Sequence, residues 1–286
     1  MTDRDALLRA ICENPDDDVL RLAYADFLEE DGDPARADFV RTQVEYAQTP
    51  PGSPVYPFVL WRNLQFERQY TTALRAELPR WPGVDFGHHV RGFVEDLHVN
   101  DYRTLKAHAR EVFGTFPIRS LRVRHLSEPA LLADLPELRY VRRLNLLFCG
   151  LQVETLRTLL GSPYLTNLAS LELDSNALPA DVVGVIEGAV GNLPALRELW
   201  LGGNRVTDAG ADRIARSAHF GPLRVLDLSH NLLTESGVRA LVGSPRLTNL
   251  TRLILKGLGP FPSNLVRLLR DRFGDGAELS TPRRRP

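Results

Sequence analysis

Few residues in this 286-residue sequence have the types and spacing that catalysis or metal binding requires. The acidic run 16–18 and the pair Asp31 and Asp33 lack the spacing of an EF-hand calcium loop, so we expect these carboxylates to cap helices. His88 and His89 are adjacent, and their side chains would point in different directions rather than share a ligand. The sequence has no phosphate-binding Gly-rich loop, no nucleophile elbow and no His-Glu-x-x-His motif. It therefore predicts no enzyme, no metal site and no cofactor.

The two cysteines, Cys12 and Cys149, are too few for a disulfide scaffold or a Cys-rich metal site. No stretch of the sequence reaches the roughly 18 consecutive apolar residues of a membrane span. The first residues are polar and do not have the pattern of a secretory signal. We therefore expect a cytoplasmic protein with no membrane partner.

The charges are unevenly distributed along the chain, although the net charge is only −1. Residues 1–50 contain 13 acidic and 5 basic side chains, and the remaining residues contain 23 acidic and 30 basic ones. This asymmetry predicts two modules, and the near-zero total argues against a general nucleic-acid binder.

The N-terminal part of the sequence has the apolar spacing of helices. We expect helices over 3–13, 18–30, 35–48 and 58–78, with a Pro-rich linker or loop at 49–57. Asp33 and Pro34 form the sequence signature of a helix start, with a capping carboxylate followed by proline.

A leucine pattern recurs from residue 97 onward, which predicts a repeat architecture. The four clearest units share the form Leu-x-Leu-x-x-Asn/Cys-x-Leu/Val and begin at Leu144, Leu171, Leu199 and Leu226. Weaker units begin at 97, 121 and 253, and the last four steps between leading leucines are 27 or 28 residues. The alternation in Leu-x-Leu predicts a strand that directs both leucines into the core. The intervening segments, such as 153–160, have helical spacing.

These units resemble the leucine-rich repeat, and the step length resembles its ribonuclease-inhibitor-like subclass. The resemblance implies an α/β fold, a right-handed solenoid with parallel strands on a concave face and helices on a convex face. A buried asparagine at each turn would satisfy backbone groups that the bend leaves unpaired. We expect this structural column to consist of Cys149, Asn176, Asn204 and Asn231.

Residues 21–34 and 36–43 resemble a short repeat-companion domain found at the N-terminus of bacterial repeat proteins. This resemblance implies a small all-α module and no known activity. We expect the module either to cap the first repeat or to offer a second docking site. The predicted organisation is an acidic helical module at 1–50, a linker and connector helix at 51–90, a solenoid of about seven units at 91–279 and a disordered basic tail at 280–286.

A function would lie on the concave face, where the residues between and after the strand leucines are exposed. Trp200 stands there among charged residues, which is typical of a protein-binding anchor, although its ring could instead cover neighbouring side chains. The other expected contact residues are Phe148, Glu172, Asp174, Asp227, Arg122, Arg124, Asn145 and Glu198. We therefore predict a non-catalytic interaction module, a scaffold that binds an unidentified protein and is itself a monomer.

Two other functions stay open. The chain could regulate an enzyme, as GTPase-activating and inhibitor-like leucine-rich repeat proteins do, but this rests on analogy between folds. It could bind RNA or DNA through a basic patch, against which the acidic residues of the central strands argue. That patch would consist of Arg119, Arg122, Arg124, Arg142 and Arg143.

Overall fold

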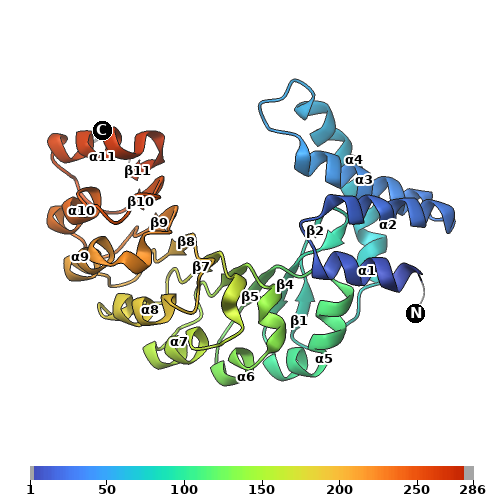
Figure 1. Ribbon diagram of the computed structural model, residues 1–286, viewed down its shortest axis with the longest axis horizontal. Coiled ribbons are helices and arrows are strands. Elements are labelled where there is room, and N and C mark those ends of the chain that lie inside the picture. The colour runs from blue at the N-terminus through green and yellow to red at the C-terminus, as the bar shows by residue number, and fades with distance from the viewer. Residues whose placement is uncertain (1–2, 280–286) are drawn as a thin grey trace, which may run out of the picture. The chain divides into compact units, whose positions relative to one another are not determined.

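The computed structural model describes residues 3–279 and divides into two compact units, 1–121 and 122–286. Figure 1 shows the helices and strands with their labels. The expected basic tail, 280–286, lies outside the described residues. Across residues 3–279, none of the helices is long and apolar enough to cross a membrane.

Four helices begin the first unit, and their bounds are α1 (Asp3–Glu13), α2 (Asp18–Glu30), α3 (Pro34–Gln48) and α4 (Tyr56–Ala76). Carboxylates start two of them, as expected. The Asp17 side chain accepts a hydrogen bond from the backbone N–H of Val19, and Asp33 accepts one from Arg36. The first three helices bury a shared apolar core that includes Ile11, Tyr24, Val40 and Phe93.

A buried arginine ties α2 to the segment after α4. Arg21 is fully buried, and its Nη2 donates to Glu95 Oε1 at 2.7 Å and to the carbonyl of Pro15 at 2.7 Å. Its Nη1 donates to the carbonyl of Arg91 at 3.1 Å, and the guanidinium lies 5.2 Å from the centre of the Phe93 ring. Burial lowers the pKa of Arg21, and the charge of Glu95 opposes this shift. Arg21 is therefore the polar centre of this unit's packing.

Short strands and one helix complete the first unit, with bounds β1 (Val84–Phe86), β2 (His89–Val90), β3 (Phe93–Val94), β4 (Asp96–Val99) and α5 (Tyr102–Thr115). Strand β5 (Ser120–Val123) includes the last two residues of the first unit and the first two of the second. β1 pairs antiparallel with β4, and β2 pairs antiparallel with β3. Asp101 caps α5 through the backbone N–H groups of Arg103 and Thr104.

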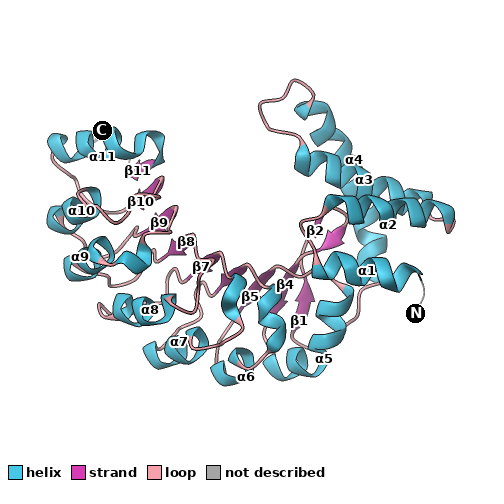
Figure 2. Cartoon of the chain, in the orientation of Figure 1, coloured by secondary structure: helices cyan, strands magenta, loops and turns pink. Residues whose placement is uncertain are grey.

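The second unit repeats strand, turn and helix (Figure 2). Its strands are β6 (Arg143–Asn145), β7 (Ser170–Glu172), β8 (Glu198–Trp200), β9 (Val225–Asp227), β10 (Arg252–Leu255) and β11 (Ala277–Leu279). Its α-helices are α6 (Pro129–Ala133), α7 (Val153–Leu160), α8 (Val182–Val190), α9 (Asp208–Arg216), α10 (Glu235–Val242) and α11 (Ser263–Phe273). Short 3-10 helices cover 136–140, 165–167, 218–220 and 274–276.

Strands β6 to β11 form consecutive neighbours of one sheet, and each neighbouring pair is parallel. The leading leucines stay in register, because Leu144 pairs with Leu171, Leu171 with Leu199, Leu199 with Leu226 and Leu226 with Leu253. These leucines are fully buried, so stacking of the units supplies the core. The strands line the inner side of this unit and α7 to α11 its outer side (Figure 1).

The asparagine column at the turns was predicted, and the structure gives its bonds. Asn204 Nδ2 donates to the carbonyls of Leu173 and Leu201 at 3.0 Å each, so it bonds to its own repeat and to the preceding one. Its Oδ1 accepts the backbone N–H groups of Leu178 at 2.9 Å and Asn176 at 3.3 Å. Asn176 and Asn231 bond in the same manner, and all three are buried.

Cys149 occupies the same column in the first of these units and is buried. Its Sγ contacts the carbonyl of Val123 at 2.9 Å. Burial raises the pKa of Cys149, which keeps it a neutral thiol. A thiol has one donor and a weak acceptor, so this position provides fewer bonds than asparagine.

A second set of cross-repeat bonds follows the helices. The sequences 161–168 and 243–250 repeat each other in the form Gly-Ser-Pro-x-Leu-Thr-Asn-Leu. Ser162 Oγ donates to the carbonyl of Ala133, and Ser244 Oγ donates to that of Ala215, each at 2.5 Å. Both serines are buried, and each satisfies a carbonyl at the end of the helix in the preceding repeat, α6 for Ser162 and α9 for Ser244.

Most expected elements are present, with shifted bounds in two places. The third helix begins at Pro34 rather than at 35, and the fourth covers 56–76 rather than 58–78. The short strands β1, β2, β3 and β11 were not expected, because they lack the leucine alternation that marked the others.

Replacing Asn204 with alanine tests the column. We expect Asn204→Ala to lower the free energy of unfolding of the second unit by about 2–4 kcal/mol, because it leaves several buried backbone groups without a partner. Asn249→Ala is the matched control, because this exposed side chain makes a single bond to Gly221 at 2.9 Å and should cost less than about 1 kcal/mol. Urea unfolding followed by circular dichroism measures both, and equal losses would contradict the role given to the column.

Replacing Arg21 with methionine tests the polar centre of the first unit. We expect Arg21→Met to cost about 3–5 kcal/mol, because a buried carboxylate loses its closest cation. Arg41→Met removes an arginine whose partners Asp26 and Glu29 are exposed, and it should cost no more than about 1 kcal/mol. Thermal unfolding measures the loss of stability in each variant. A smaller loss for Arg21→Met than for Arg41→Met would contradict the role given to Arg21.

Candidate functional site

The register of the sheet places the predicted contact residues in rows across neighbouring strands. The central row runs through Asn145, Glu172, Trp200, Asp227 and Ile254, each paired with the next. Parallel strands lie about 4.8 Å apart, so side chains in one row are immediate neighbours. Trp200 therefore stands between two carboxylates, and we call this uncovered surface of β6 to β11 the concave face.

Trp200 is half-buried rather than fully exposed. The Arg252 guanidinium lies 5.6 Å from the centre of its ring, a cation–π contact across β9. Its indole Nε1 is buried and finds no hydrogen-bond acceptor among residues 3–279. A buried indole N–H normally has a partner, so this donor is energetically unsatisfied.

Two carboxylates flank a glycine beside Trp200. Asp174 Oδ1 accepts the backbone N–H of Gly202 at 2.9 Å. A Cβ at position 202 would come within 2.7 Å of Asp174 Oδ1 and 3.5 Å of Asp227 Oδ1. Burial, followed by the charge of Asp227, raises the pKa of Asp174 to about 6, although the Gly202 N–H opposes the shift. A side chain at position 202 would therefore displace the Asp174 carboxylate, and glycine avoids this clash.

At the start of the row, basic residues offset the negative charge of Glu172. Arg143 Nε lies 3.6 Å from Glu172 Oε1, and Asn145 Nδ2 donates to the other oxygen of Glu172. Burial raises the pKa of Glu172, while the charges of Arg143 and Arg122 lower it. Asn145 is itself buried, so it positions Glu172 rather than facing a ligand. Arg122 and Arg124 are exposed, as predicted.

Sequence reasoning missed the salt bridges at the last two strands of this surface. Glu278 on β11 lies 2.6 Å from Arg252 Nη2 and 2.6 Å from Lys256 Nζ. These contacts lower the pKa of Glu278. Arg252 precedes its strand leucine just as Glu198 does, so the repeat register could have assigned it to the face. Glu278 gave no such signal, because β11 lacks the repeat motif.

Phe148 lies at the turn that precedes the asparagine column. The equivalent residues Phe148, Ser175, Gly203 and His230 all have positive φ, between 52° and 65°. This conformation costs a bulky residue about 1 kcal/mol or more relative to glycine. Phe148 nevertheless has 71% of its surface exposed, so the turn displays an aromatic ring to solvent.

The basic patch considered for nucleic acid is less available than the sequence suggested. Arg119 is buried, with Nη2 3.0 Å from Asp16 Oδ1 in the first unit. The expectation that it belongs to an exposed patch was wrong, because the acidic run 16–18 supplies its partner. Asp16 and Asp18 also approach Arg91, so only Asp17 serves as the cap.

An exposed apolar stripe at the start of α4 was also missed. Val55, Phe58, Trp61 and Leu64 are 57%, 60%, 58% and 46% exposed, and they recur every three residues. Apolar residues occur on all sides of this helix, so the sequence could not decide which face is buried.

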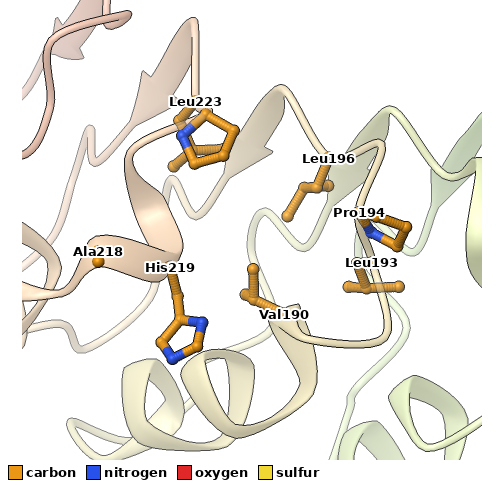
Figure 3. Close-up of a pocket in the computed structure, with 8 residues that line it drawn as sticks. Val190, Leu193, Pro194, Leu196, Ala218, His219 and Leu223 are labelled. Carbon is orange, nitrogen blue, oxygen red and sulfur yellow. The ribbon is translucent and has the colours of Figure 1, made fainter.

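Groups for metal binding or catalysis are not gathered at these surfaces. Residues 3–279 contain no cluster of three His, Cys, Asp or Glu side chains that could hold a metal ion. A pocket of about 230 Å³ between the end of α8 and residues 218–223 is shown in Figure 3. Its lining is mostly aliphatic, with His219 at one side, and its volume is below the range typical of small-molecule sites.

The raised pKa of Asp174 gives a pH prediction. The folded state favours the protonated carboxyl, so its stabilising contribution is present below about pH 4 and is lost as pH rises through about 6. Asp174→Asn keeps an acceptor for Gly202 and removes the charge, so we expect a Tm about 2–4 °C above wild type at pH 7.5 and no gain at pH 4.

The control is Asp212→Asn on α9, which removes a carboxylate that pairs with Arg216 at 2.8 Å on the surface. We expect no gain in Tm from this change. A Tm for Asp174→Asn at or below wild type at pH 7.5 would refute the repulsion between the two carboxylates.

Comparison with known proteins gives no family for this chain. No protein-family profile and no curated protein sequence matches it. Solved structures similar to it include internalin C2 from Listeria monocytogenes, with 16% identity, a TM-score of 0.39, and 66% of this chain and 75% of that chain covered. Internalin F from the same organism has 16% identity and a TM-score of 0.32, with 65% and 67% covered. The leucine-rich repeat architecture of the second unit rests on its own strands, turns and asparagine bonds.

Proposed function

We propose that this chain is a non-catalytic recognition module that binds a partner protein on the concave face. The observation that carries the proposal is Trp200, a half-buried ring between Glu172 and Asp227 on neighbouring strands. A partner that packs against the exposed part of the ring would bury the rest of its apolar surface. Large aromatic anchors of this kind dominate binding energy at protein interfaces.

The charges around Trp200 support a polarised partner. Arg122 and Arg143 lie before β7, whereas Asp174, Glu198 and Asp227 lie on or beside β7 to β9. Complementary charge on the partner would set its orientation and raise its association rate. Phe148, in the turn after β6, adds a second exposed aromatic ring.

The two alternatives have weaker support. Regulation of an enzyme, such as a GTPase, would use the same face and would appear as altered hydrolysis by the bound partner. Binding of RNA or DNA would require a broad basic surface, and the carboxylates of β7 to β9 oppose it.

Affinity capture from source-cell lysate tests the proposal. Wild type is compared with a Trp200→Ala, Glu172→Ala variant, and we expect the captured partner to bind the variant at least about thirtyfold more weakly, as for a hot spot of about 2 kcal/mol. The matched control is Trp61→Ala with Glu154→Ala, which makes the same changes at exposed positions outside the face.

The result is interpreted only with a Tm for each variant. Because Trp200 lies at a surface, we expect its loss to change Tm by no more than a few degrees. Equal capture by wild type and the Trp200 variant, or unfolding of that variant, would contradict the proposal.

A further inference from the structure

A cleft of about 610 Å³ lies in the first unit, away from the concave face. Its lining comes from the end of α4, the segment 78–81, strand β1 and residues 87, 88 and 98. The volume lies within the range that is typical of small-molecule sites. The cleft is therefore large enough to hold one small ligand.

Two arginines of this lining have no anionic partner. Arg75 and Arg80 are exposed, and neither forms a salt bridge with any of residues 3–279. Arg75 Nη2 donates to the carbonyl of Gly87 at 3.4 Å, and Gly87 also lines the cleft, so this bond holds the guanidinium there. Among residues 3–279, Asp85 is the one carboxylate in the lining. The cleft therefore has an excess of positive charge.

Two histidines complete the polar part of the lining. His98 stands opposite Asp85 in the pairing of β1 with β4, and its Nε2 lies 2.9 Å from Asp96 Oδ2. His88 is exposed, and its side chain forms no hydrogen bond with any of residues 3–279. An imidazole ring carries an N–H donor in either protonation state, so His88 adds a donor for a polar ligand.

Aromatic rings form much of the apolar part of the lining. Trp81 and Phe86 are both partly exposed, and their ring centres lie 6.0 Å apart. Trp81 stacks on His108 at 4.5 Å with an angle of 19° between the planes, and Phe86 packs against Phe116 at 4.8 Å. These contacts with α5 and the residue after it hold both rings in place. The rings therefore offer a preformed surface against which another aromatic ring can pack.

The polar and aromatic parts of the lining together favour one class of ligand. A guanidinium binds phosphate oxygens through parallel N–H donors, so two arginines without a carboxylate partner favour a phosphate group. Inorganic phosphate would occupy a small part of the cleft and leave the rings uncovered. A wholly apolar ligand would cover the rings and make no use of the arginines. A phosphorylated molecule with an aromatic ring uses both parts.

We propose that this cleft binds a small phosphorylated ligand with an aromatic ring, of the class of the nucleoside monophosphates. Arg75 and Arg80 bind the phosphate, and the ring packs against Trp81 and Phe86. Every nucleobase has a π face, so stacking of this kind accepts different bases. The site belongs to the first unit, and the inference does not depend on a partner at the concave face.

Isothermal titration calorimetry of the full chain tests the proposal with three probes, adenosine monophosphate (AMP), adenosine and inorganic phosphate. We expect AMP to bind at least about tenfold more tightly than either of the other two, because one molecule then uses the arginines and the rings together. The absence of measurable AMP binding would overturn the proposal. Equal affinity for AMP and for adenosine or phosphate would also overturn it, because one part of the lining would then contribute nothing.

Arginine variants locate the phosphate. Arg75→Gln with Arg80→Gln should weaken AMP binding at least about tenfold, because the charge-assisted hydrogen bonds are lost. The matched control is Arg68→Gln with Arg110→Gln, which removes two exposed arginines of the same unit from outside the lining and should change the affinity by less than about twofold. These four arginines form no salt bridge with any of residues 3–279, so we expect an unchanged Tm. Equal losses of AMP affinity from the two pairs would contradict the proposed site.

Tryptophan emission locates the ring. The chain has three tryptophans, and Trp61, which is 58% exposed on α4, provides the matched control for Trp81. We expect saturating AMP to change the emission of wild type and of Trp61→Phe, and the change to be lost in Trp81→Phe. An equal change in Trp81→Phe would overturn the placement of the ring against Trp81.

Discussion

The hydrogen bonds of the asparagine column constrain the second unit more than any other polar contact. Each turn bends the chain away from the sheet and leaves carbonyl and N–H groups facing the core, where water cannot reach them. Asn176, Asn204 and Asn231 bond to these groups both in their own repeat and in the one before. The same side-chain type thus follows β7, β8 and β9 and bonds each of these turns to the preceding repeat.

The buried residues that stabilise the repeats are therefore distinct from the residues that form the concave face. Buried leucines and the asparagine column fix the strands in register, and Ser162 and Ser244 repeat the same function at the helix ends. The side chains between the strand leucines do not hold the strands in register. On the central strands they carry Glu172, Trp200 and Asp227, and the register makes these one surface rather than three separate residues.

Local repetition determined what the sequence could predict. The strands at the leading leucines, the helix 153–160 and the burial of Cys149 follow from spacing that recurs in each repeat. Contacts between distant segments do not follow from spacing. The bond from Arg21 to Glu95 joins residues 74 positions apart, and it could not be inferred from the helix pattern around Arg21. The salt bridges of Glu278 were missed because β11 lacks the repeat motif, and the exposed stripe at α4 was missed because apolar residues occur on all sides of that helix.

The central claim is that the carboxylates beside Trp200 form one contact surface for a partner protein. Carbodiimide labelling of carboxyl groups, read by mass spectrometry with and without the captured partner, tests it most directly. We expect the partner to reduce labelling of Glu172, Glu198 and Asp227, while Glu154 on α7 is labelled equally in both states. Protection of Glu154 with unchanged labelling of the three strand residues would contradict it.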